Sequence, residues 1–202
     1  GQEASAAISK ELKQIVSEYG VVTPSRSAYS DVVYHRAHDM VTVKLDGTTK
    51  ARYVVGKVVG THEDATTWGI NTFAPTLDMK VLQLMLSIGL QDELSLEVWD
   101  VRAAFLKADA ASAQAYVRME PNIVSRALEE KPEWSSYVKK DGSLLVSLNK
   151  AWYGLAEAPA LWHKSIRKTL LEECEYCQHP YVKCVFYRDL GNGRKSYVLL
   201  HV

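Results

Sequence analysis

Apolar residues recur at helical spacing in three stretches of the chain. Residues 5–19, 76–91 and about 159–175 each carry such a stripe, which is typical of a helix that buries one face. The stripes comprise Ile8, Leu12, Ile15, Val16 and Tyr19, then Leu77, Val81, Leu84, Met85 and Ile88, and finally Trp162, Ile166 and Leu170. Ser5 and Gly20 are placed to cap and to end the first helix, and Pro159 suits the first turn of the third. We expect the stripe of residues 76–91 to be core packing.

Other stretches have the pattern of strands. Residues 40–56 alternate on both sides of Asp46-Gly47, whose turn chemistry predicts a β-hairpin. Residues 116–121, 143–149 and 196–202 are further strand candidates, and Gly191-Asn192-Gly193 turns the chain into the last of them. The charged stretch 122–143 has breakers at Pro132 and Asp141-Gly142, and it predicts a loop with room for a short helix, followed by a turn.

The apolar run around residues 94–106 contains one acid, Asp100. Leu94, Leu96, Val98 and Asp100 fall on one face at period two, which predicts a strand buried on both sides. A lone carboxylate there is costly unless it meets a cation or several hydrogen bonds, or lies at the end of the strand facing a cleft. Local hydrogen bonding and a functional role therefore both remain open for Asp100. The mixture of helices and strands indicates an α+β fold.

Composition and charge narrow the classes of protein. The chain has 202 residues, and its 24 basic and 24 acidic side chains give a net charge of zero, so no global positive field favours nucleic acid. It contains no run of 18 apolar residues and no basic-then-apolar N-terminal segment, so neither a membrane span nor a secretory signal is indicated. Because the chain begins with Gly1 and stops at Val202 inside an apolar strand pattern, we expect it to be an excerpt of a longer protein.

The three cysteines cluster near the end of the chain. An odd number of clustered thiols does not resemble a disulfide framework and favours a reducing, intracellular compartment. Together with His179, the thiols of Cys174, Cys177 and Cys184 offer four potential zinc ligands. Their spacing matches no common finger or ribbon, so we interpret them as buried or partly buried thiols.

Several ordered blocks between residues 40 and 202 resemble copia-type retrotransposon reverse transcriptases. The blocks are Lys50-Ala-Arg52, Thr72-Phe-Ala-Pro75, Trp99-Asp-Val-Arg-Ala-Ala-Phe-Leu106, Tyr116-Val-Arg-Met119, Tyr153-Gly-Leu155 with Ala158-Pro159 and Trp162, and Cys184-Val-Phe186. Residues 1–39 carry no motif that we can attach to chemistry.

The resemblance implies a right-hand polymerase in which an antiparallel palm sheet packs against helices. It implies an N-terminal extension with a helix (1–39), fingers in two segments (40–75 and 108–152) and a palm in two segments (76–107 and 153–202, incomplete). In the family, two Mg²⁺ ions are held by carboxylates, and the corresponding ligands here are Asp100 and the carbonyl of Val101. The resemblance assigns Arg52, and more weakly Lys50, to the triphosphate. It assigns to Phe105 the role of discriminating deoxyribose from ribose. Tyr153 and Gly154 would contact the nucleotide or the templating base pair.

The sequence also departs from the family pattern. Ala156, Glu157 and Ala160 stand where the family has Lys, Gln and Arg. His201 replaces the Tyr of the family's Leu-Leu-Tyr-Val-Asp-Asp, and the chain stops at Val202, one residue before the paired acids. We therefore expect weak binding of primer-template and deoxynucleotide, and no polymerase activity of the chain as written. The alternative is a degenerate descendant retained as a structural or interaction subunit. In either case we expect another protein chain to cover the exposed edge formed by residues 196–202.

Overall fold

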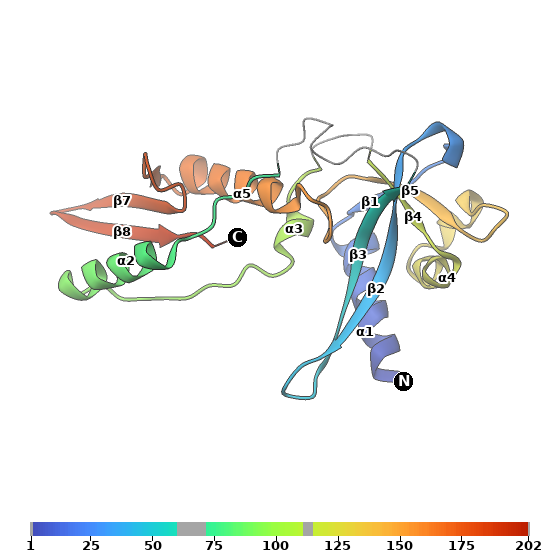
Figure 1. Cartoon of the computed structure of the whole chain (residues 1–202), viewed down its shortest axis with the longest axis horizontal. Helices are drawn as coiled ribbons and strands as arrows, with labels where there is room; N and C mark the ends of the chain where they lie inside the picture. Colours follow the sequence, from blue (N-terminus) through green and yellow to red (C-terminus); the bar gives the residue numbers. More distant parts are fainter. Residues whose placement is uncertain (1, 60–71, 111–114, 202) are drawn as a thin grey trace.

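A computed structural model describes residues 2–59, 72–110 and 115–201, with the side chains of residues 57–59 excepted. Figure 1 shows a sheet with helices α1 and α4 at one end of the molecule and a group formed by α2, α5 and the strands β7 and β8 at the other. The short helix α3 (Ala104–Lys107) lies between the two groups. The fold is mixed α+β, as the sequence indicates.

The larger sheet has five strands in the order β1-β5-β4-β2-β3. Its strands are β1 (Val22–Pro24), β2 (Tyr34–Val43), β3 (Thr49–Val59), β4 (Tyr116–Met119) and β5 (Leu144–Leu148). All neighbours are antiparallel except β2 and β4, which run parallel. The hairpin predicted around Asp46-Gly47 is confirmed as β2 and β3, and it begins earlier than expected, at Tyr34. The side chain of Asp46 closes its turn by accepting a 2.9 Å bond from the Thr48 N–H.

Helix α1 (Gln2–Lys13) continues as the π-helical segment η1 (Gln14–Glu18) and packs against the hairpin. Leu12, Ile15 and Val16 enter the core as predicted, and Gly20, at φ +57°, ends the helix. Ser5 is not the cap, because the helix already begins at Gln2. The Ser5 side chain instead accepts a 3.0 Å hydrogen bond from Arg126.

The charged stretch 122–143 is more ordered than expected. It contains α4 (Pro121–Glu130) and the 3₁₀ segment η4 (Pro132–Tyr137). Ile123, Val124 and Ala127 bury one face of α4, which is enough to hold an otherwise polar helix to the core. The short helix for which the prediction left room is present as α4, and the turn at Asp141-Gly142 is confirmed, whereas much of the predicted loop is helical.

The second group of elements follows the third predicted helix. Helix α5 (Ala158–Lys168) has Pro159 in its first turn and runs into the π-helical segment η5 (Thr169–Glu173). The strands β6 (Cys177–Gln178), β7 (Val185–Gly191) and β8 (Arg194–Leu199) form an antiparallel sheet in which β8 is an edge strand. Residues 191–193 make the predicted turn, with positive φ at all three positions.

Two predictions of burial were wrong. Residues 94–100 form neither helix nor strand, and Leu96, Val98 and Trp99 are 70%, 92% and 83% exposed. Helix α2 (Met79–Gln91) has no buried residue, and Leu84 is 60% exposed. An extended segment becomes a strand only when neighbours accept its hydrogen bonds, and the described part of the chain offers 94–100 no such neighbour.

Candidate nucleotide-binding groove

A tight turn at residues 151–155 fixes the candidate site to the edge strand β3. The indole N–H of Trp152, a fully buried side chain, donates a 2.7 Å bond to the Tyr53 carbonyl. The Val55 N–H donates a second 2.7 Å bond to the carbonyl of Tyr153. The turn therefore takes the place of a further strand at this edge of the sheet.

Gly154 allows this close approach. It has φ +93°, and a Cβ atom at this position would lie 2.1 Å from the Val55 carbonyl oxygen and 2.6 Å from Val54 Cγ1. The structure thus gives Gly154 a packing role against β3. The contact of Gly154 with a nucleotide or base pair stays a prediction. Gly154 is exposed, so the structure leaves space for such a contact.

Three of the sequence-predicted residues meet at the ring of Tyr153. The Arg52 guanidinium carbon lies 5.6 Å from the ring centroid, and the Phe105 ring lies 5.8 Å away, centroid to centroid. Burial raises the pKa of the Tyr153 phenol, Glu11 raises it further, and Arg52 opposes the shift. Arg52 is thus held against an aromatic face beside a nearby acid, a position suited to a planar cation.

An open groove of about 1030 Å³ lies beside this cluster, and we call it the β3 groove. It brings together three of the predicted residues, Lys50, Asp100 and Tyr153. The other lining residues are Glu3, Ala6, Ala7, Lys10, Glu11, Gln14, Lys44, Asp46, Gly47, Thr48, Thr49, Ala51, Arg102 and Ala103. The groove therefore lies between α1, the hairpin and the turn that precedes α3.

The expected cost of burying Asp100 does not arise, because its side chain is exposed. Val101 beside it is 39% exposed. Among the described residues, no group of three His, Cys, Asp or Glu side chains is arranged to hold a metal ion. Asp100 is the single member of the family's acid set in this sequence, so the residues present do not fit a two-metal centre.

Motif reasoning missed the side of the groove formed by α1. Lys10, Glu11 and Gln14 line it, although the stretch that contains them carries no motif. The available signal was periodicity: Glu11 and Gln14 flank the buried Leu12 at helical spacing, close to the core face. Arg102 was also missed, although it lies inside the Asp100 block.

The cysteines are all free and differ in exposure. Cys184 is buried at 2% exposure, Cys174 is partly buried and Cys177 is exposed. Burial raises the pKa of the Cys184 thiol. The interpretation as buried or partly buried thiols thus holds for two positions and is wrong for Cys177. In the part of the chain that the structure describes, these cysteines and His179 belong to no group of three or more side chains that could hold a metal ion.

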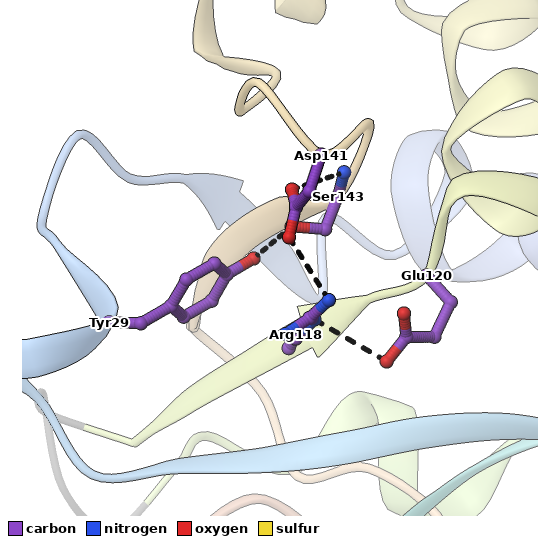
Figure 2. A network of polar contacts seen from close by, with 5 residues as sticks. All are labelled: Tyr29, Arg118, Glu120, Asp141 and Ser143. Atoms are coloured by element: carbon purple, nitrogen blue, oxygen red, sulfur yellow. Dashed lines mark hydrogen bonds and ion pairs between the residues drawn. The ribbon is translucent and has the colours of Figure 1, made fainter.

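A separate polar network joins Tyr29, β4 and the turn before β5 (Figure 2). The hydroxyls of Tyr29 and Ser143 are 2.6 Å apart, and Ser143 donates a 2.6 Å bond to Asp141. Arg118 donates a 3.1 Å bond to Asp141 and forms a 3.4 Å ion pair with Glu120. The network ties the segment before β2 to β4 and to the turn before β5, so it is a structural clamp.

A family model described as "Reverse transcriptase (RNA-dependent DNA polymerase)" matches residues 23–202. The chain belongs to the reverse transcriptase family. Three curated relatives are the Transposon Ty1-NL2, Ty1-NL1 and Ty1-BL Gag-Pol polyproteins of Saccharomyces cerevisiae (strain ATCC 204508 / S288c). Each is 26% identical over 165 residues, which cover 82% of this chain and 8% of the polyprotein.

These relatives confirm the resemblance to copia-type reverse transcriptases. The chain spans about a twelfth of their length, since the match covers 8% of each polyprotein. No solved structure matches the chain. In the described residues of this reverse transcriptase family member, no helix has the length and apolar character needed to cross a membrane.

Proposed function

We propose that this chain is part of a copia-type RNA-directed DNA polymerase, and that the β3 groove receives the triphosphate of a deoxynucleotide. The observation that supports it is the convergence of three distant segments on one site. Lys50 and Arg52 come from β3, Asp100 and Phe105 from the block before and within α3, and Tyr153 from the docked turn.

In this proposal, each residue has a role that suits its chemistry. Lys50 and Arg52 bind phosphate oxygens, with Arg52 held in place by the Tyr153 ring. Phe105 packs against that ring and would contact the sugar, where it excludes a 2′-hydroxyl. Asp100 and the Val101 carbonyl are the oxygen ligands that the resemblance assigns to magnesium. Because the residues present do not fit a two-metal centre, we derive binding and not phosphoryl transfer.

The arrangement of elements agrees with fingers and palm built from alternating segments. Residues 40–75 contribute β3 and the end of β2, and residues 108–152 contribute β4 and β5, to one sheet, as two finger segments would. Helix α3 from residues 76–107 contacts α5 from residues 153–202, as two palm segments would. The same sheet takes β1 and residues 34–39 of β2 from the N-terminal extension, so the boundary expected after residue 39 falls inside β2.

Primer extension and nucleotide binding test the proposal with the 202-residue chain. We expect no incorporation of deoxynucleotide with Mg²⁺ or Mn²⁺, because one carboxylate cannot assemble the metal pair. We expect measurable binding of dTTP by calorimetry, weakened at least threefold by Arg52→Met and unchanged by Arg194→Met, an exposed arginine on β8. Incorporation that disappears in Asp100→Asn would contradict inactivity, and equal dTTP binding by both arginine variants would refute the assigned site.

The substituted turn after Tyr153 favours a second function, that of a structural or interaction subunit. Ala156 and Ala160 remove two cations of the family pattern, and Glu157 adds an acid at the start of α5. Glu157 as the N-cap residue is favourable for the helix, whose N-terminus attracts negative charge, but unfavourable for a polyanion nearby. A chain that binds no nucleotide yet associates with itself or a partner would support this function.

A further inference from the structure

Helix α1 supplies one side of the β3 groove although it lies outside the matched family region, which begins at residue 23. Figure 1 shows it running beside the hairpin, and the two are joined at the Glu3 end by a 3.4 Å bond from the Thr49 hydroxyl to the Glu3 carboxylate. The groove therefore has one face from the family motifs and one from a helix without any motif.

The cations on the family face have no fixed acidic partner. Lys50 and Arg52 alternate with the buried Ala51 and Tyr53 along β3, so their side chains share one face. Neither forms an ion pair with any described residue. Lys50 lines the groove and is available to an anion that enters it, while Arg52 is not a lining residue and lies beside the groove against the Tyr153 ring.

Glu11 is the acid of α1 that acts on both cations. It lines the groove and is half-buried. Burial raises the pKa of Glu11, while Arg52 and Lys50 lower it, in that order. The carboxylate therefore lies within electrostatic range of the pair without being locked to either member, which leaves it free to interact with them or to be displaced.

Gln14 provides a second polar group on the same side. It is 8% exposed, it lines the groove, and its side chain makes no hydrogen bond among the described residues. Its amide atoms are not among the buried polar atoms that lack a partner, so they reach solvent in the groove and can hydrogen-bond a polar ligand or water there. The side of the groove formed by α1 therefore presents polar groups that can interact with a ligand.

We propose that Glu11 is a specificity-determining residue of the groove, because its carboxylate competes with ligand phosphate for Lys50 and Arg52. This inference rests on the proposed triphosphate site. It predicts that the charge of Glu11 lowers the affinity of the groove for a polyanion. From Coulomb's law at separations of several ångströms in a partly solvated groove, removing the charge should tighten triphosphate binding roughly two- to sixfold.

Calorimetric titration of the 202-residue chain with dTTP and with inorganic tripolyphosphate tests the inference. Glu11→Gln should bind both ligands more tightly, while Glu11→Asp, which keeps the charge, should bind like the original chain. Glu18→Gln is the matched control, since Glu18 is an exposed acid of the same helical run that does not line the groove. The gain from Glu11→Gln should shrink in an Arg52→Met background, because the competed cation is then absent.

The outcomes separate this inference from the function on which it rests. Unchanged or weaker binding by Glu11→Gln, in a chain that binds dTTP, overturns the role of Glu11 and leaves the nucleotide site standing. An equal gain from Glu18→Gln, or an undiminished gain with Arg52→Met, also overturns it, because a general charge effect would then suffice. No binding of either ligand by any form overturns both proposals.

Discussion

Replacing Gly154 with alanine should detach the turn that carries Tyr153. The new Cβ would lie 2.1 Å from the Val55 carbonyl oxygen, so the turn must move away from β3. That movement strains or breaks the bonds from Trp152 to Tyr53 and from Val55 to Tyr153, both 2.7 Å long. Overpacking costs about 1–3 kcal/mol. Two lost hydrogen bonds cost about 1 kcal/mol each.

Gly47→Ala is the matched control for this substitution. Gly47 also has positive φ, at +79°, but a Cβ there meets nothing within 4 Å. Both variants carry the left-handed penalty of about 1–2 kcal/mol, so their difference isolates the contact with β3. Urea unfolding should show Gly154→Ala to be roughly 3–5 kcal/mol less stable than Gly47→Ala, by the sum of the packing and hydrogen-bond terms. A difference below about 1 kcal/mol, less than the packing term alone, would refute the reasoning.

Two further predictions concern pH and association. Hydrogen bonds from Ser143 hold the pKa of Asp141 below its ordinary value of 3.8, so its stabilisation is present above that pH and is lost as pH falls through the folded-state pKa. The urea midpoint difference between the original chain and Asp141→Asn should therefore be largest at pH 7 and shrink below pH 3.8, and a pH-independent difference would contradict this. The edge strand β8 should drive self-association in sedimentation velocity, reduced by Val198→Lys, whereas a monodisperse original chain would contradict an open edge.

Elements that depend on local chemistry were predictable from the sequence. The hairpin follows from Asp46-Gly47, and the turn before β8 follows from Gly191-Asn192-Gly193, because both need backbone conformations that few residues adopt. The first and third helices follow from apolar spacing. For α4 the sequence left room only for a short helix inside a loop, because the buried stripe of this helix is narrow, although Pro121 in its first turn was a usable signal.

Burial of the 94–100 segment and of α2 could not be predicted in the same way. An apolar pattern indicates that one face of a segment is suited to burial, but it does not identify the element that packs against that face. The described elements leave Val98 and Trp99 exposed, together with Leu84 and Leu90 of α2. Pattern-based prediction therefore gave the correct type of element for α2 and the wrong environment, whereas at 94–100 the missing partner changed the element itself.

The residues of the candidate site likewise include some that the sequence predicted and others that it did not. Lys50, Arg52, Asp100, Phe105 and Tyr153 were found by motif, and the fold brings them close to one another. Gly154 was found too, but its contact with Val55 gives a reason that no motif states. The residues of α1 that line the groove were missed because the apolar pattern of this helix identifies only its buried face. It does not identify the polar residues beside that face.

The positions of the retained and lost charges bear on the choice between the two proposed functions. The retained cations are on β3, a strand held by β2 on one edge and by the docked turn on the other. The lost cations belong to positions 156 and 160, in the turn and first helical residues after Tyr153. The substitutions at positions 156 and 160 therefore do not change the strand that carries Lys50 and Arg52. A triphosphate bound by Lys50 and Arg52 does not require Ala156 or Ala160 to be basic, so those changes weaken the case for template binding more than the case for nucleotide binding.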